Sequence, residues 1–516
     1  SGCRLFFAET DSLDAYLAGA YTSPGAVTPN DTFYVDGYHW HYDMVDLPRA
    51  WGILQDLGSA PGGAFHETYV AVVDSGIVAS GGSVDHADLG LNVFYDHDDP
   101  TGGYDFYRVD FREFGDNDPE DPGDGGWHGT HVTGTIAADW GDGGVVGVGL
   151  DRLKVVPIRS LTDVGSILDV ADGILYAVNS PRTPSEASSG PGTPTPVRVI
   201  NLSLGGPGGG AYFYEAIQEA VDAGVTVVAA AGNNNGGKVD YPGAYDNTIA
   251  VSAVGPGKNF ASYSSRGPEV DFAGPGGDLD VDIGLGPGSG GVLSTVGPED
   301  DYAYFEGTSM ATPHVAGIVG LLYAYEPNLS QSEVYTILLN TAEDLGEPGR
   351  DDSYGWGLVQ AGKALEYLIN AGREHGVAPS GGALSPQTEG AGSVGIAGVI
   401  PGTRPRGVVP QRRGALRPTP GAERHPTQIL LRLEDAARGG RAGDRGRPSL
   451  TETARQAEAL GNLHPGARIP ETPVRGPGVI VLEAADPAGW LTLLEELAAD
   501  PAVRYAQPVY RYRLIQ

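Results

Sequence analysis

Hydrophobic runs of two lengths alternate along the first 370 residues of the chain. The short runs, which are rich in β-branched residues and often end in glycine, are residues 69–73, 153–158, 197–204, 225–231 and 248–254. Longer stretches with helical spacing lie between them, at 167–178 and 214–223. Short apolar runs without alternation are typical of strands buried on both faces, and strands that alternate with helices predict a parallel sheet with right-handed crossovers.

The most apolar stretch, residues 318–325, is hydrophobic on nearly every side and predicts a helix that is buried all round. Pro327 ends it, and two further helices are expected at 332–341 and 359–369. Ser309 precedes the apolar stretch, at the helix start, where free N–H groups and the helix dipole stabilise negative charge. A capped core helix would also explain Ser309, because serine is a common N-cap.

Two other polar residues are expected at the same edge of the sheet. Asp74 follows the run 69–73, at the carboxyl end of a strand, where open α/β sheets bind their ligands. His128 opens a helix at 128–138 that is lined by small residues. Asp74 could instead cap a turn. His128 and His131 could instead bind zinc, although no glutamate stands between them as in the metalloprotease pattern.

The last third of the chain differs in composition. Residues 375–425 are rich in Gly, Pro and Arg and show little periodicity, as linkers do. Strands expected near 428–434, 468–474, 478–484 and 503–514, with helices at 451–460 and 486–499, predict a small β-α-β-β-α-β, ferredoxin-like α+β unit. We therefore divide the chain into a lead-in segment (1–35), an α/β domain (36–373), a linker (374–426) and an α+β domain (427–516).

The net charge of −34 is concentrated in the α/β domain, because residues 374–516 hold 17 of the 32 basic residues and only 14 of the 66 acidic ones. A part this acidic should repel nucleic acid and anionic lipid, so no nucleic-acid partner is expected. The charge suits calcium binding or a salty or extracellular setting, and it also suits simple solubility.

Cys3 is the single cysteine, which excludes an intramolecular disulfide. No apolar run reaches the roughly 18 residues that a membrane helix needs. The start Ser1-Gly2-Cys3 resembles the end of a bacterial lipoprotein signal, in which the cysteine takes a lipid anchor. A free cysteine near a trimmed start would explain it as well.

Asp74, His128 and Ser309 stand in the chain order of one known catalytic triad, for which subtilisin is the reference example. The surrounding stretches resemble motifs of the subtilisin-family serine proteases, and they are VVDSG at 72–76, HGTHVTG at 128–134, NLSLGG at 201–206, AAGN at 230–233 and GTSMATPH at 307–314. The resemblance covers residues 36–370. It implies a doubly wound parallel sheet with helices on both faces, and a protein or peptide substrate.

The resemblance also implies roles for single residues. Ser309 would be the nucleophile, His128 the general base and Asp74 the residue that orients the imidazole. Asn233 would donate a side-chain N–H to the oxyanion, beside the N–H of Ser309. Intact residues at these four positions argue against the competing class, a binding or scaffold protein of the cell envelope that kept the protease fold.

Substrate-binding positions follow from the same resemblance. Ser203, Leu204 and Gly205 would offer an edge to which a substrate adds as an extended strand. Asp240, just before Tyr-Pro-Gly, would lie at the base of the pocket for the P1 side chain and favour Lys or Arg there. A surface aspartate or a calcium ligand is the alternative interpretation of Asp240.

Calcium is the cofactor that the resemblance implies. Asp88 matches a family ligand, although the sequence Asp139-Trp140-Gly141-Asp142 departs from the amides usual in the partner loop. The acidic segment 96–124 resembles a second calcium loop, with candidate ligands Asp105, Asp116, Asp118, Asp121 and Asp124. A solvated acidic loop would have the same composition.

Residues 427–516 resemble the propeptide that precedes catalytic domains of this family, above all in the ending DPAVRYAQPVY at 500–510. In the family this domain comes first, whereas here it comes last. The resemblance implies an intramolecular inhibitor that places residues 511–516 in the substrate cleft. An unrelated α+β binding module is the alternative. The sequence as a whole thus favours an exported, calcium-stabilised serine endopeptidase that is autoinhibited by its C-terminal domain.

Overall fold

The computed structural model describes residues 25–58, 65–95, 104–107, 118–123, 125–141, 143–179, 197–298, 301–374, 424–433 and, with gaps, 457–514. The lead-in to residue 24, most of the linker, Cys3, Asp116 and Asp124 lie outside them.

A seven-stranded sheet forms the centre of the first part of the chain, in the order β11-β10-β9-β7-β1-β5-β4. All of its neighbouring strands are parallel. The strands are β1 (Thr68–Asp74), β4 (Tyr104–Asp105), β5 (Leu153–Arg159), β7 (Val197–Leu202), β9 (Thr226–Ala230), β10 (Ile249–Val254) and β11 (Phe272–Pro275). The five predicted strands are therefore confirmed, with small shifts at their ends. The two edge strands were not predicted, because they are short and carry little apolar signal.

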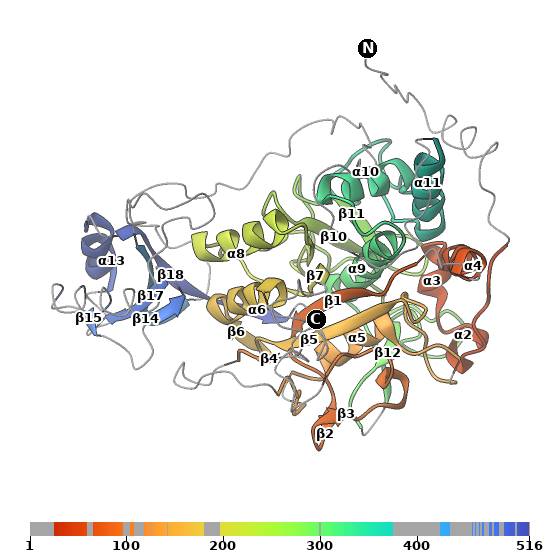
Figure 1. Cartoon of the computed structure of the whole chain (residues 1–516), viewed down its shortest axis with the longest axis horizontal. Helices are drawn as coiled ribbons and strands as arrows, with labels where there is room; N and C mark the ends of the chain where they lie inside the picture. Colours follow the sequence, from red (N-terminus) through yellow and green to blue (C-terminus); the bar gives the residue numbers. More distant parts are fainter. Residues whose placement is uncertain are drawn as a thin grey trace, which may run out of the picture.

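Helices cover both faces of this sheet (Figure 1). The central helix α9 (Thr308–Tyr325) and α5 (His128–Ala137) pack on one face, while α6 (Ile167–Asn179) and α8 (Ala211–Asp222) pack on the other. Alternate residues of β1 serve the two layers, since Val70 and Val72 join the α9 cluster, whereas Ala71 and Val73 join that of α6 and α8. This two-sided burial explains why the strands lack an apolar–polar alternation.

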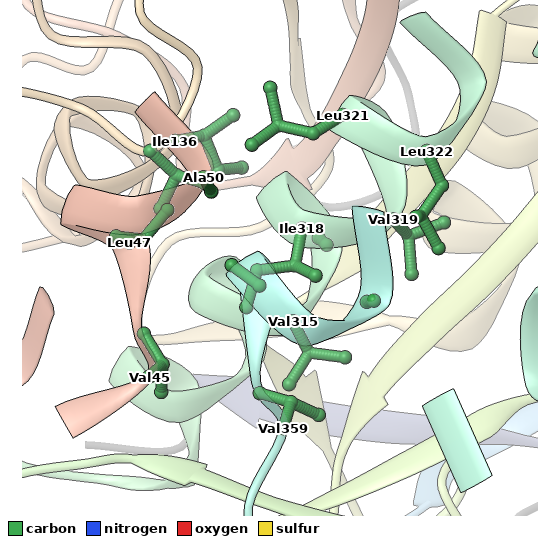
Figure 2. Packing of buried hydrophobic residues seen from close by; sticks show 14 of the residues in the cluster. Val45, Leu47, Ala50, Ile136, Val315, Ile318, Val319, Leu321, Leu322 and Val359 are labelled. Atoms are coloured by element: carbon green, nitrogen blue, oxygen red, sulfur yellow. The ribbon is translucent and has the colours of Figure 1, made fainter. Parts of the chain in front are cut away.

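The helix α9 is buried along almost its whole length, as its all-round apolar pattern predicts. The segment with α2 (Thr32–Val35), α3 (Trp40–Met44) and α4 (Leu47–Gly58) covers it from one side, together with α11 (Ala361–Glu374). Figure 2 shows side chains of this cluster, among them Val45, Leu47 and Val315. The helix α10 (Gln331–Thr341) begins with a capping box formed by Ser330 and Glu333.

Small antiparallel pairs, which the sequence analysis did not foresee, complete this part. The strands β12 (Val292–Thr295) and β13 (Tyr302–Phe305) form a hairpin directly before α9, and β2 (Ala79–Ser80) pairs with β3 (Ser83–Val84) before the 3-10 turn η1 (Ala87–Leu89). No described helix is long and apolar enough to span a membrane.

The C-terminal part contributes an antiparallel sheet and a helix, drawn in blue in Figure 1. Its elements are β14 (Arg424–Leu433), β15 (Ala467–Arg468), β16 (Val474–Gly476), β17 (Val479–Ala484), α13 (Trp490–Ala499) and β18 (Val503–Leu514). On β14, Ile429 and Leu431 pack in the cluster of α13, whereas Leu430 joins the cluster of α6 and α8. The helix expected at 451–460 lies largely outside the described residues, so the ferredoxin-like order and the domain boundaries stay predictions.

Candidate active site

Asp74 and His128 meet where β1 ends and α5 begins. His128 Nδ1 lies 2.7 Å from Asp74 Oδ1, and both side chains are fully buried. Because a carboxylate oxygen only accepts, Nδ1 carries the proton and Nε2 keeps its lone pair. Nε2 is buried and makes no hydrogen bond to any residue that the structure describes. In a neutral imidazole, Nε2 is therefore the nitrogen that can accept a proton.

The close approach of β1 and α5 depends on glycine. A Cβ atom added to Gly129 would lie 2.3 Å from the carbonyl oxygen of Gly76 and 3.3 Å from the Cβ of Asp74. Trp127, at the N-cap of α5, has a φ of 61°, which is uncommon for a side chain of this size. The first turn of α5 is therefore tightly constrained next to Asp74.

Ser309 is the second residue of α9, as the sequence predicts, and is bonded to Ser203 in both directions. Its Oγ donates to Ser203 O at 2.9 Å, and its carbonyl accepts from Ser203 Oγ at 2.8 Å. That carbonyl is available because Pro313, four residues on, has no N–H to complete the helical bond. The Ser309 hydroxyl is therefore not hydrogen-bonded to His128 Nε2 in this structure, because that nitrogen has no partner among the described residues.

Asn233 follows β9 and is oriented by Thr308. The N–H and the hydroxyl of Thr308 donate to Asn233 Oδ1 at 3.0 and 2.9 Å. These two bonds fix the amide oxygen and leave the Nδ2 donors to face elsewhere. The N–H of Ser309 belongs to the first turn of α9, where backbone donors lack helical partners. Thr308, which the sequence did not single out, therefore orients Asn233 next to the first turn of α9.

The edge predicted at 203–205 pairs with the chain's own last strand. The strand β8 (Leu204–Gly205) is antiparallel to β18, with Leu514 opposite Leu204 and Arg513 opposite Gly205. On its other side β18 pairs with β6 (Val164–Ser166), which was not predicted because it is only three residues long. The strand β18 thus lies between two edge strands, as a bound extended peptide would.

Side chains hold β18 against α6 and α8. Gln507 is buried, and its Oε1 accepts from the N–H of Ala211 at 2.7 Å. Val509 and Leu430 share a hydrophobic cluster with Ile167 on α6. The C-terminal sheet therefore has one face on α13 and the other on the α/β part.

Asp240 lies beside the glycine that precedes Asn233. A Cβ atom added to Gly232 would lie 2.6 Å from Asp240 Oδ2. Partial burial of its carboxylate raises the pKa of Asp240 to about 6, while a hydrogen bond with Asn234 acts in the opposite direction. The bridge between Gly206 and Tyr241 brings this segment to the chain that follows β8. The carboxylate is therefore near the backbone of Gly232, and the segment that carries it lies against the chain that follows β8.

The described metal-ligand candidates do not converge on one point, and each is engaged by other protein groups. Asp88 Oδ2 accepts from Val145 N and Tyr302 Oη, at 2.7 and 2.9 Å, and Asp105 pairs with Arg159. Asp118 accepts from Tyr95 Oη, and Asp121 from Ser75 Oγ. No group of three or more His, Cys, Asp or Glu side chains that could hold a metal occurs among the described residues. The calcium cluster expected in segment 96–124 is therefore not assembled in the described part of that segment.

The zinc alternative gains no third ligand among the described residues, although His128 Nε2 and His131 Nδ1 make no hydrogen bond there. His131 Nε2 lies 3.0 Å from Val292 O and 3.1 Å from Ala303 O, and its ring stacks on Phe305. The nitrogen is thus used by the β12–β13 hairpin, whereas Asp74 holds Nδ1 of His128.

Comparison with known protein families identifies the family of this chain. The model of the subtilase family matches residues 66–357, which is more than half of the chain and includes the segments of Asp74, His128, Asn233 and Ser309. The chain belongs to the subtilase family. Its central parallel sheet with helices on both faces is accordingly the subtilisin-like fold that the sequence predicts.

Relatives of this subtilase include named proteases. It is 38% identical over 339 residues, or 65% of its length, to a halolysin-like extracellular serine protease Nep of Natrialba magadii. It is 35% identical over 368 residues, or 67% of its length, to an extracellular protease of Xanthomonas campestris. The chain spans 52% and 58% of these two relatives, respectively. A solved structure described as proteases from Pseudoalteromonas arctica matches with 33% identity and a TM-score of 0.54, covering 66% of this chain and 99% of that one.

Proposed function

We propose that this subtilase is a serine endopeptidase that hydrolyses peptide bonds in proteins or peptides. Ser309 Oγ attacks the scissile carbonyl carbon while its proton passes to His128 Nε2, and Asp74 stabilises the imidazolium. The same proton then leaves with the amine product, and water releases the acyl group from Ser309. The observation that carries the proposal is the buried 2.7 Å contact between His128 Nδ1 and Asp74 Oδ1, in a subtilase that has serine at position 309.

The test is covalent labelling of the full chain with a fluorophosphonate probe. Wild-type protein should be labelled at Ser309 and should cleave a casein or peptide substrate, at the latest after residues 426–516 are removed, whereas the Ser309→Ala variant should do neither in either form. The competing proposal, a cell-envelope binding or scaffold protein that retains the protease fold, expects no labelling even after residues 426–516 are removed.

We propose further that the C-terminal part inhibits the enzyme in cis. The pairing of β18 with both β8 and β6 supports this, because a substrate strand would need the same backbone groups. Deletion of residues 511–516, or of everything after residue 425, should raise activity on small peptides. Unchanged activity and unchanged folding yield in both truncations would favour an unrelated binding module.

Asp240 is proposed as the base of the P1 pocket, with a preference for Arg or Lys. Its nearness to Gly232, and the contact of its segment with the chain that follows β8, support this assignment. The direct test compares peptides that differ only at P1. Equal rates on Phe and Arg peptides would remove the assignment.

Calcium is proposed as a stabilising ion, with Asp88 as the retained candidate ligand. Asp88 is 2% exposed and lies against the loop after α5, where Asp139 N donates to its carbonyl and Val145 N to its carboxylate. Thermal unfolding with calcium and with EDTA should differ by several degrees in the wild type and less in Asp88→Asn. The five candidates in segment 96–124 form no described cluster, and the proposal does not depend on them.

An extracellular location is proposed because two matched relatives are named as extracellular proteases. Attachment of a lipid to Cys3, and with it anchoring in the cell envelope, is a separate proposal that rests on the sequence alone. Intact mass spectrometry of protein purified from its source would show the added acyl mass, and an unmodified Cys3 would contradict the anchor.

A further inference from the structure

A buried carboxylate lies directly behind the Asp74–His128 pair. Asp121 is fully buried, and both of its oxygens are used in the structure. Its Oδ2 accepts from Ser75 Oγ at 2.7 Å, and its Oδ1 accepts from Gly123 N at 2.8 Å. The residue that the sequence suggests as a metal ligand therefore faces the end of β1.

Ser75 connects the two elements that carry the catalytic pair. Its N–H donates to Asp74 Oδ1 at 2.8 Å, and its Oγ accepts from Gly129 N at 2.9 Å. A serine hydroxyl has one proton and two lone pairs. Because Asp121 takes the proton, a lone pair of Ser75 Oγ is directed to Gly129, the residue after His128.

The backbone fixes Asp121 independently of its side chain. Asp121 N donates to Ile77 O at 2.8 Å, and Ile77 N donates to Pro119 O at 2.9 Å. A Cβ atom on Gly125 would lie 2.5 Å from the Cβ of Ser75, so the segment lies as close to β1 as glycine permits. Replacing the carboxylate should therefore leave the backbone of residues 119–121 in place, while Gly123 N loses its acceptor and the hydroxyl of Ser75 is released.

We infer that Asp121 is a positioning residue, which acts through Ser75 to hold the first turn of α5 against the end of β1. The inference rests on the proposed peptidase function of Asp74, His128 and Ser309. Without the carboxylate the Ser75 hydroxyl can rotate, Gly129 N loses its acceptor, and the imidazole of His128 drifts relative to Asp74. Asp121 touches neither substrate nor reacting atoms in this scheme.

The test compares Asp121→Ala, Ser75→Ala and the double variant in the full chain, with active sites counted by fluorophosphonate titration. Each single variant should lower kcat by about 10- to 100-fold, the scale on which displacements of about 1 Å act, and should change KM far less. The kcat of the double variant should be no lower than that of the less active single variant, because both substitutions break the same connection from Asp121 through Ser75 to Gly129. Ser75→Thr keeps the hydroxyl and should retain most of the activity.

Asp271→Asn is the matched control, because Asp271 is also fully buried and also accepts from one backbone N–H and one hydroxyl, those of Ala250 and Tyr335. It should lower stability but leave kcat per titrated site unchanged. The low-field proton resonance of His128 Nδ1 should shift or broaden in Asp121→Ala and Ser75→Ala only.

The outcomes separate the two levels of the proposal. If the wild type is neither labelled nor active, and remains so after residues 426–516 are removed, the peptidase function fails. If the wild type is active and both alanine variants keep kcat within about twofold, or if Asp271→Asn loses kcat equally, the positioning role of Asp121 is overturned. Should Asp121→Ala fail to fold, the comparison of Ser75→Ala with Ser75→Thr decides alone.

Discussion

Gln507 caps a helix that begins almost 300 residues earlier in the chain. Its Oε1 accepts from the N–H of Ala211, the first residue of α8, at 2.7 Å. Gly210, at the N-cap, supplies no side-chain acceptor, and a Cβ atom there would lie 2.6 Å from Gln507 Nε2. The absence of a side chain at Gly210 thus makes room for a cap that arrives from β18.

Replacing Gln507 by alanine should therefore loosen β18. A hydrogen bond of this kind contributes about 0.5–1.5 kcal/mol, so the dissociated form should become roughly 2- to 13-fold more populated. If β18 inhibits in cis, the full-length Gln507→Ala variant should hydrolyse small peptides faster by a similar factor.

Arg504→Ala is the matched control for this prediction. Arg504 lies on the same strand, but its side chain is 47% exposed and its contact with Glu215 is 3.8 Å long. Exposed pairs contribute about 0–1 kcal/mol, so this variant should behave almost as the wild type. If wild type, Gln507→Ala and Arg504→Ala are equally active, the docking of β18 does not inhibit the enzyme.

Because the orientation of Asn233 is fixed, we expect its removal to lower kcat and to leave KM nearly unchanged. Thr308 holds Asn233 Oδ1, so Asn233→Ala removes one preset donor without altering Asp74 or His128. Removal of one oxyanion donor typically lowers kcat by about 10²–10³ and affects KM little. Thr308→Val, which removes only the orienting hydroxyl, should give a smaller loss in kcat, and equal losses in KM and kcat for Asn233→Ala would contradict the role.

The sequence predicts the sheet, the central helix and the residues around the Asp74–His128 pair, because these depend on long apolar runs and on short contiguous motifs. It misses β6 as a pairing partner of β18, since a strand of three residues carries no periodicity. This strand is defined only when a distant strand supplies the hydrogen bonds, whereas the edge at 203–205 is expected from the resemblance.

Asp121 illustrates a second limit. Composition groups it with other aspartates of an acidic loop, which suits a cation. Its actual partners, Ser75 Oγ and Gly123 N, become visible only when β1 and the loop are brought together. Asp88 and Asp105 are comparable cases, because their partners Tyr302 and Arg159 lie far away in the chain.

Asp240 predicts a P1 preference that depends on pH. Burial raises the pKa of Asp240 to about 6, so its carboxyl group is mostly neutral at pH 5 and charged at pH 7.5. The ratio of kcat/KM for Arg over Phe at P1 should therefore rise as the pH increases through about 6. In Asp240→Asn the ratio should be low and flat. A wild-type ratio that does not change between pH 5 and 7.5 would contradict the placement of Asp240 in the pocket.

Three buried histidines pack together at α9, the helix that carries Ser309. His314 Nδ1 lies 2.7 Å from Met310 O, so this nitrogen donates and Nε2 accepts. His41 Nδ1, 2.8 Å from His314 Nε2, must then be the donor. The ring of His39 packs against His41, and all three histidines are buried. Protonation of His314 would set two N–H groups against each other.

These three histidines predict that the fold loses stability in acid. Burial lowers the pKa of His314 to about 4 and that of His39 to about 3, and it also lowers the pKa of His41. In the unfolded chain histidines titrate near 6.5. Between pH 6.5 and about 4 the unfolded state therefore binds protons that the native state does not, and each such histidine lowers the free energy of unfolding by about 1.4 kcal/mol per pH unit.

Urea unfolding at pH 8, 6.5, 5.5 and 4.5 would measure this slope, and His39→Phe isolates one contribution. The ring of His39 contacts Tyr34, His41 and Tyr42, so phenylalanine should preserve most of the packing. At pH 8 the free energy of unfolding of the variant should match that of the wild type within about 1 kcal/mol. Below pH 6.5 it should fall less steeply than in the wild type, by about 1.4 kcal/mol per pH unit. Parallel curves for the two proteins would mean that His39 is not held neutral by the fold.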